Sequence, residues 1–123
     1  MHALIIEQDM WIILMIEDSL RVLGYTSFDF ADSPQEAVAA VSRRCPDLIT
    51  AGVHLGTGTG PEAVREICSE MATPVVFVTA TPWEVRAIDP QAIIVAKPFC
   101  QGALHEGVLR ATSAGVAKAA IEL

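Results

Sequence analysis

The sequence predicts a doubly wound α/β domain built on a five-stranded parallel sheet. Apolar segments of strand length alternate with helical segments five times along the 123 residues, a pattern typical of parallel strands joined by covering helices. Hydrophobic residues make up 52% of the chain, enough to bury both faces of such a sheet. The length fits one compact domain, so we expect residues 1–123 to form a single unit.

The first half of the chain contains the clearest element boundaries. The first strand is a continuous apolar segment, and Gly24 ends the helix that follows it. Ser33 is a favourable N-cap for the second helix, because Pro34 suits the first turn and Glu36 can complete a capping box. The elements expected here, in order, are Ala3–Glu7, Met10–Leu23, Thr26–Phe30, Ser33 to about Arg44, and Asp47–Ala51.

The second half continues the alternation with a short fourth helix. A dense run of β-branched and aromatic residues predicts the strand Pro74–Thr79. Pro82–Ile88 has room for at most two helical turns before the next apolar strand begins. The elements expected here, in order, are Pro61–Met71, Pro74–Thr79, Pro82–Ile88, Ala92–Ala96 and roughly Gln101–Ile121.

Several candidate site residues fall at the carboxyl ends of the predicted strands. They are Glu7, Gln8, Gly52, Thr79 and Lys97. Open parallel sheets bind their ligands at this edge, where the ends of the strands meet. The sequence therefore predicts one pocket there, to which the third strand contributes a glycine and no side chain.

The motifs at these strand ends resemble those of a known family. They are Glu7-Gln8-Asp9, the third strand with its Gly-rich loop Gly56–Gly60, Thr79-Ala80, and Lys97-Pro98-Phe99. Together they resemble the receiver domain of bacterial response regulators in two-component phosphorelay signal transduction, and the resemblance spans essentially the whole chain. It implies a flavodoxin-like fold. In that family an Asp at the end of the third strand accepts a phosphoryl group from a histidine kinase, and here that position is Gly52. The chain therefore resembles a degenerate pseudo-receiver.

The same resemblance implies a magnesium site that this chain has largely lost. Receivers hold Mg²⁺ with two acids after the first strand, the acceptor Asp, and a carbonyl two residues later. Glu7 keeps the first acid and the His54 carbonyl is available, whereas Gln8 and Gly52 bring no charge. Two carboxylates about 4 Å apart repel by about 4 kcal/mol at an effective dielectric near 20, and a single carboxylate has less need of a cation. We therefore expect weak or absent Mg²⁺ binding and no other cofactor.

The switch residues of the family are also altered. Without an acceptor, Lys97 is expected to pair with Glu7, and the Lys97-Pro98 peptide is expected to be cis, as in the family. Thr79 is present, but Ile94 stands where the family has a mobile aromatic ring. The stretch between Thr79 and Lys97 is shorter than the family's. A phosphorylation-driven switch is therefore not expected. Asp9 is expected to cap the first helix outside the pocket.

The first helix has more apolar residues than one buried face requires. One stripe at helical spacing suits the core: Ile12, Ile16, Ser19, Leu20 and Leu23. A second stripe supplies the interface candidates Trp11, Leu14, Met15 and Val22. The closing helix is rich in small residues, at Ala111, Ala114, Gly115, Ala117, Ala119 and Ala120. These features favour a homodimer or a partner-protein interface, and the alternative is a wide buried stripe with scattered surface apolar residues.

Composition excludes several classes of function. The net charge of −7 argues against nucleic-acid binding through a basic face, and no apolar run approaches the roughly 20 residues of a membrane span. Cys45, Cys68 and Cys100 lack metal-ligand spacing and are expected to be reduced thiols in a cytoplasmic protein. None of the three histidines has a Cys or acid at ligand spacing. No nucleophile elbow or phosphate-loop motif is present, so an enzyme is not expected.

These observations favour a receiver-like domain that acts by phosphorylation-independent protein–protein interaction. Its expected partners are a histidine kinase, a phosphotransfer protein or another regulator. Two alternatives stay open. The chain could be a phosphoacceptor receiver in which Gly52 has replaced the acceptor Asp, or a small-molecule-binding α/β domain that uses the vacated pocket.

Overall fold

The computed structural model describes the backbone of residues 1–122 and the side chains of residues 1–113. Five parallel strands form one sheet in the order β2-β1-β3-β4-β5. The strands are β1 (His2–Ile6), β2 (Ser27–Ala31), β3 (Leu48–Ala51), β4 (Val75–Thr79) and β5 (Ile93–Ala96). The helices are α1 (Met10–Val22), α2 (Pro34–Arg43), α3 (Gly60–Cys68), α4 (Pro82–Ile88) and α5 (Gln101–Glu122). The predicted doubly wound α/β fold is confirmed.

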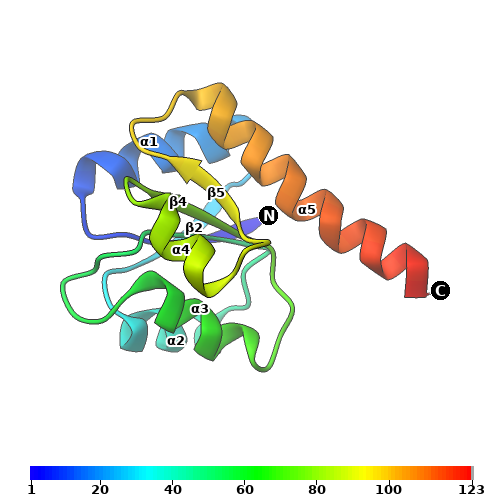
Figure 1. The fold of residues 1–123 in the computed structure, drawn as a ribbon, viewed down its shortest axis with the longest axis horizontal. Helices are drawn as coiled ribbons and strands as arrows, with labels where there is room; N and C mark the ends of the chain where they lie inside the picture. Colours follow the sequence, from blue (N-terminus) through cyan, green and yellow to red (C-terminus); the bar gives the residue numbers. More distant parts are fainter. Residues whose placement is uncertain (123) are drawn as a thin grey trace.

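Helices cover both faces of the sheet, and each face has its own apolar core (Figure 1). On one face α1 and α5 contribute buried side chains such as Ile16 and Leu104. On the other face the sheet packs against α2, α3 and α4, from which Ala37, Ala63 and Val85 are almost fully buried. Successive residues of the central strands β1, β3 and β4 alternate between the two cores, which explains why these strands are mostly apolar.

The helix starts follow the expected local chemistry. The Asp9 carboxylate accepts the N–H of Trp11 at 2.9 Å, so Asp9 caps α1 as predicted. The Ser33 hydroxyl accepts the N–H of Glu36 at 3.1 Å. The return bond of the predicted capping box is different: the Glu36 carboxylate accepts the N–H of Asp32, one residue before the cap.

Several element boundaries differ from the predictions. α3 ends at Cys68 rather than at Met71, and the Ser69 hydroxyl donates to the Glu66 carbonyl at this end. β1 ends at Ile6, so that Glu7 begins the loop to α1 although its N–H still bonds the Ala31 carbonyl at 2.9 Å. The Lys97-Pro98 peptide is cis, as expected from the resemblance.

The two apolar stripes of α1 have the predicted division. Ile16, Ser19 and Leu20 are buried, and Ile12 and Leu23 pack partly buried against the same core. The four interface candidates are exposed, with Trp11 at 77% and Val22 at 67%. These four residues are therefore surface residues, and whether they form an interface or are scattered surface apolar residues stays open. Of the small residues of α5, Ala111 is buried, whereas the side chains from Ala114 onward lie outside the described part of the chain.

Candidate functional site

The carboxyl ends of four strands enclose a small pocket of about 180 Å³. All the candidate pocket residues named from the sequence line it: Glu7, Gln8, Gly52, Thr79 and Lys97. The rest of the lining consists of Asp9, Val53, His54, Ala80 and Thr81. The parallel register brings these positions together, because Ile6 pairs with Ala51 and Thr79 pairs with Ala96. Asp9 caps α1 as predicted but also lines the pocket, so the expectation that it lies outside the pocket is wrong.

Glu7 is the centre of this pocket and is only 4% exposed. Its Oε1 atom lies 3.0 Å from the Lys97 ammonium, which is the pairing that the sequence predicts. Its Oε2 atom accepts the backbone N–H groups of Gln8 at 3.0 Å and Asp9 at 3.1 Å. A buried carboxylate needs this kind of compensation, because an unpaired charge in the interior costs several kcal/mol. Both oxygens of Glu7 are therefore already engaged by the protein.

Gly52 makes this arrangement possible. A Cβ atom at position 52 would lie 2.9 Å from Glu7 Oε1 and 3.4 Å from its Cδ. The Glu7 carboxylate thus lies in the space where a side chain of residue 52 would begin. The position that looked vacant in the sequence is filled by Glu7 from the loop after β1, and a larger residue there would displace the Glu7 carboxylate from its contact with Lys97.

The loop after β3 holds Gly52 in place. The Gly52 N–H donates to the Ile6 carbonyl at 2.8 Å, and the Gly60 N–H donates to the Val53 carbonyl at 2.9 Å. A Cβ at Gly60 would overlap the Gly52 carbonyl oxygen, and Gly58 has a φ of 70°. The glycines of the loop therefore allow α3 to begin directly against the end of β3.

The predicted switch residues, Thr79 and Ile94, are both held by contacts within the protein. Thr79 is buried, and its hydroxyl oxygen accepts the Thr81 N–H at 3.0 Å and lies 3.1 Å from the Thr81 hydroxyl. Ile94 is half-buried and packs against the core beneath α3 and α4. The Thr79 hydroxyl is therefore tied to the β4–α4 loop, and Ile94 contributes packing alone.

The donor set of the pocket fits a divalent cation poorly. Mg²⁺ prefers oxygen ligands that carry charge, in a near-octahedral arrangement. Glu7 supplies the sole carboxylate among the residues predicted to hold the metal, and its oxygens are already bonded to Lys97 and to two N–H groups. Asp9 is used as a helix cap. Within the described residues, no group of three or more His, Cys, Asp or Glu side chains could hold a metal ion.

Two histidine–acid pairs were missed by sequence reasoning. His2 Nε2 lies 3.0 Å from Asp29 and His54 Nε2 lies 3.2 Å from Glu84. The sequence analysis considered the histidines only as metal ligands, so neither contact was predicted. The His2 pair depends on strand register, because His2 pairs with Ser27 and Leu4 with Asp29. The correct register of β1 against β2 is the signal that would have revealed it.

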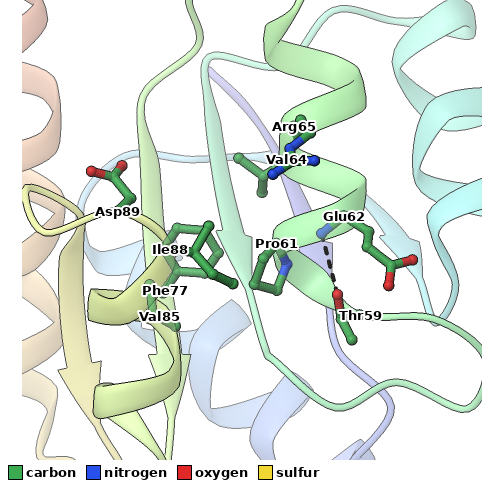
Figure 2. Close-up of a pocket in the computed structure, with 9 residues that line it drawn as sticks. All are labelled: Thr59, Pro61, Glu62, Val64, Arg65, Phe77, Val85, Ile88 and Asp89. Carbon is green, nitrogen blue, oxygen red and sulfur yellow. Dashed lines mark hydrogen bonds between the residues drawn. The ribbon is translucent and has the colours of Figure 1, made fainter.

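A larger hollow between α3 and α4 was also missed (Figure 2). Its volume is about 440 Å³, more than twice that of the strand-end pocket, and it lies on the face of the sheet away from α1. The one sequence signal was the brevity of the fourth helix.

No helix in the part of the chain that the structure describes is long and apolar enough to span a membrane.

Comparisons with known proteins support the receiver fold. The model of the response regulator receiver domain matches residues 3–109. Phyllosphere-induced regulator PhyR of Methylorubrum extorquens is 36% identical over 103 residues, which is 80% of this chain and 38% of that protein. Transcriptional regulatory protein PdtaR of Mycobacterium tuberculosis is 34% identical over 102 residues, covering 80% of this chain and 50% of that protein.

A solved structure shows the same architecture. The solution structure of the PhyR receiver domain of Erythrobacter litoralis matches with a TM-score of 0.82 at 30% identity, covering 89% of this chain and 88% of that one. This chain spans half or less of the length of the two curated relatives. Receiver domains act in two-component signalling and interact with kinases or other regulators. From its sequence match, its fold and the placement of its strand-end residues, this chain belongs to the response regulator receiver domain family.

Proposed function

We propose that this receiver domain signals by binding a partner protein without accepting a phosphoryl group. The observation that carries the proposal is the position of Glu7, whose carboxylate lies where the side chain of residue 52 would begin and is paired with Lys97. Phosphoryl transfer needs a nucleophile, a cation and free donors for the developing charge. Here glycine occupies the position of the nucleophile, and the lysine that would donate to the phosphoryl group is already paired with Glu7.

The proposal includes weak or absent Mg²⁺ binding. A cation that bound Glu7 would have to compete with the Lys97 ammonium at 3.0 Å and with two backbone N–H groups. It would find a neutral amide at Gln8 and the His54 carbonyl as its remaining predicted ligands. Coordination at this pocket therefore disrupts an arrangement that is already compensated.

The proposed partners are a histidine kinase, a phosphotransfer protein or another regulator in the cytoplasm. The relatives PhyR and PdtaR are both regulators by name, and this chain matches only part of each. Exposed apolar residues on α1 offer one contact surface, including the surface for a homodimer. The strand-end pocket gives little support to a small-molecule role, because about 180 Å³ is below the usual range of ligand pockets.

Phosphodonor labelling tests the proposal directly. The wild-type chain and the variant Gly52→Asp would be incubated with acetyl phosphate and Mg²⁺, and the intact mass measured. We expect no added phosphoryl group on the wild type. Stoichiometric labelling of the wild type would overturn the proposal.

The double variant Gly52→Asp/Glu7→Asp tests whether Glu7 blocks an acceptor at position 52 or whether only the acceptor side chain has been replaced. The shorter side chain at position 7 leaves room for an aspartate at position 52, which in the single variant meets Glu7 Oε1 at 2.9 Å from its Cβ. We expect the double variant to accept more label than the single variant. If the single Gly52→Asp variant is already fully labelled, the rest of the phosphoacceptor machinery is intact and the alternative of a simple acceptor replacement is favoured.

A further inference from the structure

The hollow between α3 and α4 has an apolar base and an exposed apolar residue at its mouth. Phe77 on β4 and Val85 on α4 form its base, and both are almost fully buried from outside. Figure 2 shows Ile88 on the α4 side facing Pro61 and Val64 on the α3 side. Ile88 lies at the mouth of this hollow and is 60% exposed.

The hollow is elongated along α3. A second hollow of about 300 Å³ shares Val64, Phe77 and Asp89 with the first. It extends along α3 to Cys68 and past the start of β5 to Ala111 on α5. On α3 the lining residues Pro61, Val64 and Cys68 recur every three or four positions, so they mark one side of that helix. From Pro61 to Cys68 the helix rises about 10 Å, at 1.5 Å per residue. We call the two hollows together the α3–α4 groove.

The groove exists because α4 is short. α4 comprises only Pro82–Ile88, and the chain leaves it at the cap residue Asp89. α4 has seven residues, compared with nine in α3, and among the strands α4 contacts mainly β5. The length, the helical lining and the open side suit a helix of about two turns, which packs 8–10 Å from its neighbour, better than a compact small molecule.

The charge around the groove selects a basic occupant. The two bordering helices and the cap of α4 carry four acids and two arginines: Glu62, Glu66, Glu84, Asp89, Arg65 and Arg86. Among the described residues, Glu62, Asp89 and Arg65 line the first hollow. Figure 2 shows, however, that the Glu62 carboxylate points away from it, and Glu84 is paired with His54. The preference for a basic occupant therefore comes from the excess of acids over arginines on the two helices. The whole chain has a net charge of −7, which adds a long-range attraction for a cationic partner.

We propose that the α3–α4 groove binds an amphipathic helix of a partner protein. The helix places apolar side chains at i, i+3, i+4 and i+7 over Phe77 and Ile88 and carries lysine or arginine on its flanks. The proposal names the chemistry of the partner that the domain binds, and it rests on the binding role proposed above. The two can fail separately, since the groove is distinct from the Glu7–Lys97 pocket and its test needs no phosphodonor.

NMR titration of the full chain tests the proposal. The probe is a synthetic peptide of about 14 residues, held helical by a side-chain cross-link because isolated helices of this length are marginal in water. It carries leucines at the stated spacing and lysines elsewhere. We expect saturable shifts of the backbone amides of α3 and α4, and no binding of the same peptide with glutamates in place of lysines.

Matched variants identify the surface. Ile88→Asp should weaken binding at least tenfold, and Glu62→Lys about threefold by charge reversal. Leu109→Asp is the control, because Leu109 is also an exposed helical residue, at 57%, but lies on α5. Shifts confined to α1, unchanged affinity of Ile88→Asp, or equal binding of the acidic peptide would each overturn the proposal. A dimer that Ile88→Asp dissociates would instead assign the groove to a second copy of this chain and overturn the partner helix.

Discussion

The strand-end pocket and the α3–α4 groove differ in whether their side chains already have contacts within the protein. In the pocket, the Glu7 carboxylate is bonded to Lys97 and to two backbone N–H groups, and little volume remains. In the groove, Ile88 is 60% exposed at the mouth, and Pro61 and Val64 opposite it are partly exposed. We therefore expect the residues of the family's chemical site to stabilise this domain and the groove to be available for binding.

The largest effect is expected from Lys97→Met. The substitution leaves the Glu7 carboxylate, which is 4% exposed, without its counter-charge. Removing one partner of a buried pair costs 3–5 kcal/mol, and we expect about 3 kcal/mol, at the low end, because Glu7 keeps its two N–H donors. Urea denaturation measures the loss. The double variant Glu7→Gln/Lys97→Met should lose less than the single variant, and equal losses would show that the pair is not coupled.

A smaller effect is expected from Gly52→Ala. The new Cβ would lie 2.9 Å from Glu7 Oε1, so the carboxylate must move and its bond to Lys97 must lengthen. We expect a loss of about 1 kcal/mol in the free energy of unfolding. Gly102→Ala is the matched control: its Cβ meets nothing within 4 Å in α5, and the change should be neutral or stabilising. A stabilising Gly52→Ala would contradict the filled pocket.

Ile88→Asp should leave stability nearly unchanged. Ile88 is 60% exposed, and surface substitutions of this kind usually alter the free energy of unfolding by no more than about 0.5 kcal/mol. Thermal melting beside Leu109→Asp checks this expectation. A loss as large as that of Lys97→Met would mean that the groove is part of the structural core, and the contrast between the two regions would disappear.

The smallest effect is expected in cysteine reactivity. Burial raises the pKa of the Cys68 thiol, and a bond from the Thr73 backbone offsets part of this shift. Less thiolate is therefore present at neutral pH, and the thiolate is the nucleophile. Cys68 should react with iodoacetamide a few-fold more slowly than the exposed Cys45 and Cys100, as followed by peptide mass spectrometry. Because Cys68 lies at one end of the groove, equal rates would argue for a more open α3 end.

The fold could be predicted because its signals are local. Alternating apolar and helical segments gave all ten elements in order, and Asp9 and Ser33 gave the helix starts. The pairing of Lys97 with Glu7 was also predictable, since parallel strand ends converge and the acceptor carboxylate is absent. The early end of α3 was not predicted, because Ser69–Met71 has no strong helix breaker.

The remaining features depend on relations between elements. The place of the Glu7 carboxylate beside Gly52 depends on a side-chain conformation that the sequence pattern does not encode. The contact of His2 with Asp29 requires the register of β1 and β2. The α3–α4 groove is a space between two helices, each of which is ordinary by itself, so that only their packing on the sheet reveals it.

The most direct test of the filled pocket is an NMR titration of the wild-type chain with Mg²⁺ and beryllofluoride, an analogue of the phosphoryl group. With Glu7 in the space beside Gly52 and bonded to Lys97, we predict no saturable shift at the amides of Gly52, Thr79 or Lys97 at millimolar concentrations. Saturable shifts at these three amides would show that the pocket still accepts a phosphoryl-like ligand with its cation, and would contradict the account.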